Sequence, residues 1–159
     1  MTKYAQWAAD YQENRVAVLY DSMWDGTRKL AEAMARGLSD ASPGTEVRVH
    51  NVAKTDKNDV ITDVFRSKAV LLGSPTVNKG VLNAVAGIME EIKGLKFKGK
   101  KAAAFGCYGW SGESNKVLSE FLRSSGFEVL DDGFKALWVP DASTLDAAYE
   151  YGKAFAAKL

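Results

Sequence analysis

Runs of apolar, β-branched residues that alternate with amphipathic helical segments constrain the fold of this chain more than any other feature. The first run, Val16–Tyr20, leads through a polar loop into a segment in which Leu30, Met34 and Leu38 recur at helical spacing. The run predicts a buried strand, and the segment predicts a helix with one apolar face. Strands that alternate with helices along a chain predict an α/β fold with a parallel sheet and right-handed crossovers.

The rest of the chain continues this alternation. Ala69–Gly73 and Lys101–Phe105 are almost continuously apolar, which is typical of strands covered on both faces. Glu46–His50 alternates apolar and polar residues, which predicts an edge strand with one solvated face. The same patterns predict further strands at Glu128–Leu130 and Phe134–Val139, and helices within Asp56–Lys68 and at Val81–Ile92, Glu113–Ser125 and Ser143–Lys158.

Three loops of small and hydrogen-bonding residues follow the first, third and fourth strands, at 21–27, 74–80 and 106–112. Strands of this kind fit a five-stranded parallel sheet in the doubly wound order 2-1-3-4-5, where ligands bind beyond the C-terminal ends of strands one and three. All three loops lie at that edge of the sheet. We therefore predict that they form one binding site.

The first loop has the chemistry needed to hold a phosphate. It places Ser22, Gly26 and Thr27 where a helix begins, and there the free backbone N–H groups and the helix dipole favour an anion. The alternative is that these residues only cap the helix. Asp25 would oppose a phosphate, so we expect its side chain to point outward and to form a cap or a salt bridge.

The second and third loops suit a planar, hydrogen-bonding ring. Thr76 and Asn78 in the second loop, and Tyr108 and Trp110 in the third, stand among glycines that let the backbone approach a ligand closely. We expect Trp110 to stack on the ring, since aromatic side chains favour such contacts. The alternative is that Trp110 packs on the surface or faces a partner.

Competing motifs are missing from the sequence. It contains no G-x-x-x-x-G-K-[ST] motif, and Gly106, Gly109 and Gly112 are spaced G-x-x-G-x-x-G, which is not the dinucleotide fingerprint. Cys107 has no His near it in sequence to activate it, so we interpret it as a packed or backbone-contributing residue. We interpret His50 as structural or solvated because partners for a metal or catalytic role are not evident.

Composition excludes several classes of function. The formal net charge of +1 gives no case for nucleic-acid binding. A secretory signal and an apolar run long enough to cross a membrane are both missing from the sequence, and its single cysteine cannot form an internal disulfide. These features predict a cytoplasmic protein that binds neither nucleic acid nor membranes.

Three motifs carry a specific resemblance. Ser22-Met23-Trp24-x-x-Thr27, then the segment 73–78 (GSPTVN) and then the segment 105–112 (FGCYGWSG) resemble the flavodoxin-like FMN domain of flavodiiron proteins, also called A-type flavoproteins. The likeness covers about residues 14–159. Residues 1–14 resemble the connector that follows a metallo-β-lactamase-like diiron domain in that family, so we expect a helical connector there and an FMN-binding domain over residues 15–159.

The resemblance implies a flavodoxin-like three-layer sandwich, for which flavodoxin with FMN is a standard example of the order 2-1-3-4-5. It implies a module that relays electrons from rubredoxin or a similar donor to a diiron centre that reduces oxygen or nitric oxide, with possible homo-oligomers in the full-length context. The implied FMN-binding residues are Ser22, Met23, Trp24, Asp25, Gly26, Thr27, Ser74, Pro75, Thr76, Val77, Asn78, Gly80, Gly106, Cys107, Tyr108, Gly109, Trp110, Ser111 and Gly112.

The chain also departs from the family pattern. Its single histidine cannot build a His/carboxylate diiron cage, so we assign no metal-ligating or catalytic residue and expect an oxidoreductase module rather than a complete reductase. Asn78 stands where ordinary flavodoxins have a glycine. Since Asn adopts positive φ less readily than Gly, we expect Asn78 to resist that conformation and to bring the two one-electron potentials closer together.

Two other functions stay open at this point. An FMN-dependent NAD(P)H:quinone reductase would use the same fold but would need an open face above the flavin ring. A cofactor-free α/β interaction domain would have no use for the three loops. Visible absorption after addition of FMN distinguishes a flavoprotein from the cofactor-free domain. NAD(P)H consumption with a quinone as acceptor distinguishes the quinone reductase from the electron-transfer module.

Overall fold

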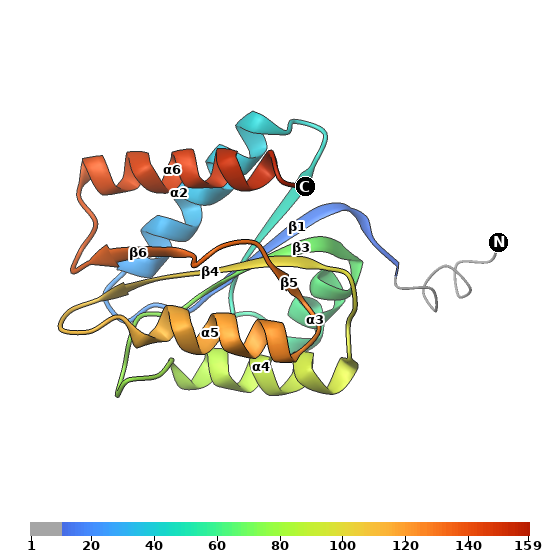
Figure 1. Cartoon of the computed structure of the whole chain (residues 1–159), viewed down its shortest axis with the longest axis horizontal. Helices are drawn as coiled ribbons and strands as arrows, with labels where there is room; N and C mark the ends of the chain where they lie inside the picture. The colour runs from blue at the N-terminus through green and yellow to red at the C-terminus, as the bar shows by residue number, and fades with distance from the viewer. Residues whose placement is uncertain (1–10) are drawn as a thin grey trace.

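The computed structural model describes residues 11–159, which form a six-stranded parallel sheet between two layers of helices (Figure 1). The order is β2-β1-β3-β4-β5, and β6 also pairs with β4. This confirms the predicted α/β fold and strand order. The strands are β1 Glu13–Tyr20, β2 Glu46–Asn51, β3 Ser67–Gly73, β4 Lys101–Tyr108, β5 Glu128–Val129 and β6 Phe134–Leu137, and the helices are α2 Gly26–Ala41, α3 Lys57–Arg66, α4 Asn83–Leu95, α5 Glu113–Ser124 and α6 Ala142–Ala156.

The fifth strand of the predicted sheet is divided into two short strands. β5 pairs with the start of β4, and β6 pairs with its end, from Phe105 to Tyr108. The predicted helical connector over residues 1–14 lies mostly outside the described residues, which begin at Tyr11. β1 begins at Glu13.

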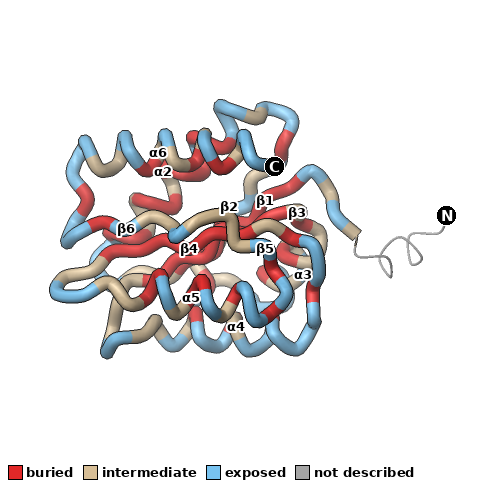
Figure 2. The backbone as a smooth tube through the Cα atoms, viewed as in Figure 1, coloured by how far each residue is buried: buried red, intermediate tan, exposed pale blue. Residues whose placement is uncertain are grey.

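Each face of the sheet has its own apolar core. Helices α2 and α6 cover one face, and α3, α4 and α5 cover the other. Figure 2 shows the buried residues as a band along the strands, with exposed residues on the outer sides of the helices. α2 and α6 approach so closely at Gly37 that an added Cβ atom there would lie 2.0 Å from the Tyr149 carbonyl oxygen. Residues at this crossing must therefore be small.

β4 is longer than the sequence predicted. Gly106, Cys107 and Tyr108, which we expected in a loop, are the last residues of the strand. Two contacts explain the difference: β6 pairs with this stretch, and a Cβ atom on Gly106 would lie 2.0 Å from the Ser74 carbonyl oxygen. The glycine here permits close approach of two chain segments and does not mark a turn.

A network of charged side chains joins β1, β2 and α3 at the N-terminal end of the sheet. Arg15 is 3% exposed and forms ion pairs with Asp63 and Glu46, the latter at 2.7 Å. His50 Nε2 lies 2.6 Å from Asp63 Oδ2, which confirms the structural interpretation of His50. This end of the sheet therefore pairs its buried charges, as stable interiors require.

None of the helices within residues 11–159 is both long and apolar enough to cross a membrane. The same residues contain no group of three or more His, Cys, Asp or Glu side chains that could hold a metal ion.

Candidate cofactor-binding site

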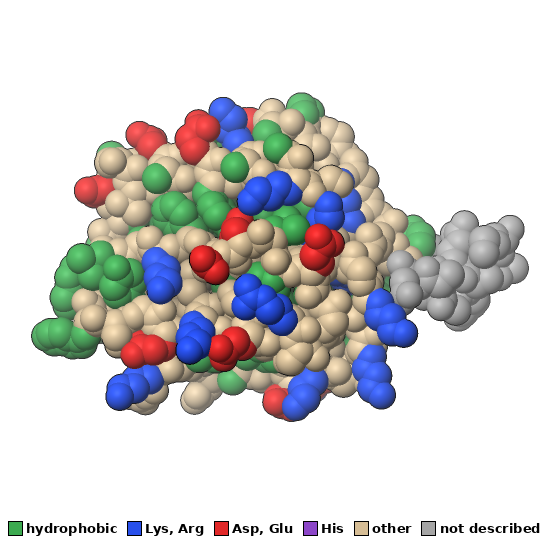
Figure 3. Space-filling view, viewed as in Figure 1, with side chains coloured by type: hydrophobic (Ala, Val, Ile, Leu, Met, Phe, Trp, Pro, Cys, Tyr) green, Lys and Arg blue, Asp and Glu red, His purple; other side chains and the backbone are tan. Residues whose placement is uncertain are grey.

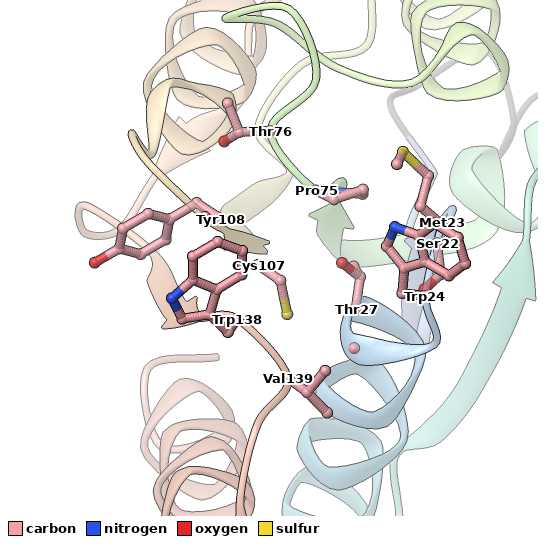
Figure 4. A pocket seen from close by; sticks show the side chains of 12 residues that line it. Ser22, Met23, Trp24, Thr27, Pro75, Thr76, Cys107, Tyr108, Trp138 and Val139 are labelled. Carbon is pink, nitrogen blue, oxygen red and sulfur yellow. The ribbon is translucent and has the colours of Figure 1, made fainter.

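A pocket opens at the C-terminal edge of the sheet, between the loops that follow β1, β3 and β4 and the segment that follows β6 (Figure 4). The structure thus brings together parts of all three predicted loops. The pocket is lined by Ser22, Met23, Trp24, Gly26, Thr27, Pro75, Thr76, Cys107, Tyr108, Gly109, Trp138 and Val139.

The first loop presents two hydroxyl groups that the protein does not use for capping. Among the described residues, the buried Ser22 Oγ has no hydrogen-bond partner, and Thr27 Oγ1 has none apart from the weakly interacting thiol of Cys107. The N-cap of α2 is Asp25, whose side chain makes no capping hydrogen bond. The alternative that these residues only cap the helix is therefore wrong. Two buried hydroxyls at a helix N-terminus are suited to binding an anion.

Asp25 turns away from the pocket, as the sequence predicted. Its backbone has a φ of 62°, and its carboxylate accepts a hydrogen bond from Arg28 Nε at 3.1 Å. The Arg28 guanidinium also holds the pKa of the Asp25 carboxyl below its usual value. The negative charge that would have opposed a phosphate is thus paired at the surface.

Gly26 and Cys107 bring the first loop against the end of β4. A Cβ atom on Gly26 would lie 2.9 Å from Cys107 Sγ, so a larger residue would push α2 away from the sheet. Burial raises the pKa of the Cys107 thiol, which disfavours the nucleophilic thiolate. The Cys107 carbonyl accepts a hydrogen bond from the Thr76 N–H at 3.0 Å, so this cysteine packs and contributes its backbone, as predicted.

The second loop is held by its own hydroxyl groups. Ser74 is fully buried and does not line the pocket, because its Oγ accepts a hydrogen bond from the Leu82 N–H at 3.0 Å and donates one to the Pro75 carbonyl at 2.9 Å. Thr76 lines the pocket, and its Oγ1 donates to Ser114 Oγ at 2.9 Å. Since Ser114 lies in the first turn of α5, this bond fixes the second loop relative to the helix that follows the third loop.

The end of the second loop is a tight two-residue turn. Val77 and Gly80 exchange both backbone hydrogen bonds, at 2.8 and 3.2 Å, while Asn78 has a φ of 49° and Lys79 a φ of 60°. Two positive φ values are what a type I′ turn requires. The expectation that Asn78 resists positive φ is therefore wrong: the turn imposes this conformation, and Asn tolerates it better than most residues.

Val77, Asn78 and Gly80 line a second hollow beside Asp21 rather than the pocket itself. Gly106 also lies outside the lining, within β4. The structure thus places five of the predicted site residues behind or beside the pocket: Ser74, Val77, Asn78, Gly80 and Gly106.

The third loop divides between pocket and solvent. Tyr108 and Gly109 line the pocket, whereas Trp110, Ser111 and Gly112 do not. Trp110 is 90% exposed, and its ring meets the edge of Trp138 with a centroid distance of 6.0 Å and an interplanar angle of 71°.

Sequence reasoning missed Trp138 and Val139, which line the pocket from the segment after β6. A usable signal was present. Phe134–Val139 was predicted as a strand, and in a parallel sheet its C-terminal end must lie at the same edge as the other loops. Counting the end of every predicted strand would have included this fourth segment.

Comparison with known proteins decides the family. A family model described as flavodoxin matches residues 18–152. The chain belongs to the flavodoxin family. It is 45% identical over 151 residues to the anaerobic nitric oxide reductase flavorubredoxin of Klebsiella pneumoniae, which covers 95% of this chain and 31% of that protein.

Solved structures give the same result. The chain superposes on the rubredoxin oxygen:oxidoreductase of Desulfovibrio gigas with a TM-score of 0.92 and 35% identity, covering 98% of this chain and 38% of that one. For the flavodiiron protein of Giardia intestinalis the TM-score is 0.90 with 28% identity, covering 98% of this chain and 39% of that one. The chain therefore spans about a third of the length of these flavodiiron relatives and matches their flavodoxin-like FMN domain.

FMN is the cofactor of this kind of flavodoxin-family domain, and the residues present fit it. The pocket joins unpaired buried hydroxyls at the start of α2 with the aromatic side chains of Trp24, Tyr108 and Trp138. A phosphate requires hydrogen-bond donors and a flat ring requires apolar walls. Both kinds of group lie in one pocket.

Proposed function

We propose that this chain is an FMN-binding electron-relay module of a larger oxidoreductase. The observation that carries the proposal is the pair of buried hydroxyls, Ser22 Oγ and Thr27 Oγ1, which line the pocket at the N-terminus of α2. Leaving a buried hydroxyl unsatisfied costs stability. A bound phosphate monoester would supply an acceptor for Ser22 Oγ, and for Thr27 Oγ1 a stronger acceptor than the Cys107 thiol.

Each loop has a separate task in this proposal. The loop around Ser22 and Thr27 binds the FMN phosphate, while Pro75, Thr76 and Tyr108 border the ring. Bound FMN supplies the capacity to take up and release electrons. The protein holds the cofactor in place, excludes water from its inner side, and leaves its outer edge open to a partner.

The rim of the pocket supports transfer of electrons to another protein. Apart from Val49 and Leu95, the large hydrophobic side chains exposed within the described residues all lie around this pocket, and Figure 3 shows such side chains gathered at the end of the molecule where β4 and β6 end. Exposed apolar patches of this kind mark interaction sites. We define the apolar rim as Met23, Trp24, Trp110, Leu137, Trp138 and Val139.

The partners follow from the relatives. Because the matched relatives are named flavorubredoxin and rubredoxin oxygen:oxidoreductase, we propose a rubredoxin-like donor and a diiron domain as acceptor, with oxygen or nitric oxide as the final substrate. We further propose a cytoplasmic location, homo-oligomers in the full-length context, a connector over residues 1–14 and an FMN-binding domain over residues 15–159. The cofactor-binding set proposed from the sequence completes the site.

Stopped-flow reduction of the FMN-loaded protein tests this function. Reduced rubredoxin should reduce the bound flavin rapidly, and the apoprotein should show no absorbance change at flavin wavelengths. NAD(P)H should be consumed slowly or not at all when a quinone is the only acceptor. Rapid NAD(P)H oxidation with a quinone, together with slow reduction by rubredoxin, would contradict the relay and favour a quinone reductase.

A further inference from the structure

Trp138 has an unusual backbone for a bulky residue. Its φ is 56°, in the left-handed region that side chains with a Cβ rarely enter. The residue follows β6 directly, and its N–H donates a hydrogen bond to the Tyr108 carbonyl at 2.8 Å. Strained conformations of this kind persist only where the surroundings impose them, and they concentrate at functional sites.

The indole ring of Trp138 is held in place although it is not buried. The six-membered part of its indole lies against Gly109, where an added Cβ atom would lie 3.0 Å from the ring. Trp110 meets it edge to face at 6.0 Å. Trp138 is nevertheless 61% exposed. Core packing therefore does not account for the strained backbone, because most of the ring surface gains nothing from burial.

The left-handed backbone directs the ring into the cofactor pocket. In Figure 4 the Trp138 ring stands beside Tyr108 and Cys107 on one side of the pocket, and Trp24 and Thr27 stand on the other side. An extended residue after β6 would continue the alternation of the strand instead. The strain thus turns an aromatic surface toward the space between the loops.

Resting on the proposed function, we propose that Trp138 is an FMN-binding residue whose ring forms one wall of the flavin-ring site. The segment after β6 then joins the three loops as a fourth part of the site. The backbone strain at Trp138 is retained because it places this wall, and Gly109 lacks a side chain because the wall lies against it.

Three substitutions at one position separate the ring from the backbone. Trp138→Ala and Trp138→Gly both remove the ring, but only glycine relieves the positive φ. Trp138→Phe keeps an aromatic surface. Leu95→Ala is the control, since Leu95 is also an exposed large hydrophobic residue, at 50%, but ends α4 outside both the pocket and the apolar rim. Equilibrium titrations with FMN and with riboflavin, and urea unfolding of the apoproteins, are the measurements.

The Ala and Gly variants should each bind FMN about tenfold more weakly or worse, since an aromatic wall contributes both buried area and stacking. Riboflavin should lose the same factor, because the contact is with the ring and not with the phosphate. Trp138→Phe should recover most of the affinity, and Leu95→Ala should stay within about twofold of the wild type. The Gly apoprotein should withstand more urea than the Ala apoprotein, which reverses the usual order.

Wild-type affinity for FMN in both the Ala and Gly variants would overturn the proposal. A Gly apoprotein no more stable than the Ala apoprotein would overturn the role of backbone strain. These outcomes differ from failure of the proposed function, in which the wild-type protein itself would not bind FMN.

Discussion

The two ends of the parallel sheet use polar groups in opposite ways. At the N-terminal end, the buried Arg15 is paired with Asp63 and Glu46, and Asp63 also contacts His50. At the C-terminal end, Ser22 and Thr27 keep buried hydroxyls without a strong partner. Strand β1 links the two ends.

Backbone strain is concentrated at the C-terminal edge. Asp25, Asn78, Lys79 and Trp138, in three different segments there, have positive φ, whereas Lys96 is the one described non-Gly residue with positive φ that ends a helix before a strand begins. Natural proteins tend to break local rules at functional sites and to compensate elsewhere. The comparison teaches that the paired end stabilises the fold, and that most of the strained residues gather where a cofactor would bind.

Removing the central cation of the paired end should have the largest effect on stability. Arg15→Leu removes the buried guanidinium that pairs with both Asp63 and Glu46, so we expect the free energy of unfolding to fall by about 3 kcal/mol. Urea unfolding of the apoprotein measures this loss. The affinity of the folded variant for FMN should stay within about twofold of the wild type because the pocket lies at the other end of the sheet.

Arg48→Leu is the matched control for that substitution. Arg48 also contacts Glu46, with its Nε at 2.8 Å, but is 52% exposed. Its loss should cost less than about 1 kcal/mol, as for other surface pairs. Equal destabilisation by the two leucine variants would show that the buried network has no special role.

Relieving backbone strain at the C-terminal end of the sheet should raise the free energy of unfolding, by less than Arg15→Leu lowers it. Lys79 occupies a left-handed turn position with a φ of 60°, so Lys79→Gly should raise the free energy of unfolding by about 0.5–1 kcal/mol. Lys54→Gly provides the control, because Lys54 lies in a turn and its φ is not positive. A loss of stability at both positions would contradict the assignment of strain to the 77–80 turn.

Lowering the pH should weaken the ion pairs at the N-terminal end of the sheet, and this should change stability less than either of the two substitutions above. The hydrogen bond from Arg15 lowers the pKa of Glu46 in the folded state. Its contribution is therefore present above the ordinary Glu pKa of about 4.3 and is lost as the pH falls through the lower folded value. Glu46→Gln should flatten this acid part of the profile of melting temperature against pH.

Glu120→Gln removes a carboxylate from an exposed pair with Lys116, at 3.8 Å, and should leave the same profile unchanged. An unaltered acid slope in Glu46→Gln would contradict the contribution of that pair to the paired end.

The sequence predicted the fold well because the buried strands can be recognised from their high content of apolar residues. Val16–Tyr20, Ala69–Gly73 and Lys101–Phe105 are almost continuously apolar, and they form the centre of the sheet. The extension of β4 to Tyr108 depends on its pairing with the distant strand β6. Periodicity within one segment cannot report such pairing.

The site was predicted less completely, for a related reason. Ser22 and Thr27 follow from a local strand–turn–helix pattern, and the structure places both in the pocket. Whether Trp110 or Trp138 faces the pocket depends on backbone conformation at single residues, such as the φ of 56° at Trp138. The backbone conformation of Asn78 likewise depends on the type of turn that contains it. That turn type is known only once Val77 and Gly80 are seen to pair.

The binding of FMN against that of riboflavin tests the central claim most directly, since the two ligands differ only in the phosphate. Thr27→Val and Ser22→Ala should each weaken FMN by about 10- to 100-fold, because hydrogen bonds to a charged group are lost. Both variants should leave riboflavin within about twofold of the wild type. Ser119→Ala serves as the control. Ser119 Oγ is also buried and has no hydrogen-bond partner within residues 11–159, but Ser119 lies on α5 and does not line the pocket. Equal losses for FMN and riboflavin, or no loss for either, would contradict a phosphate site at the start of α2.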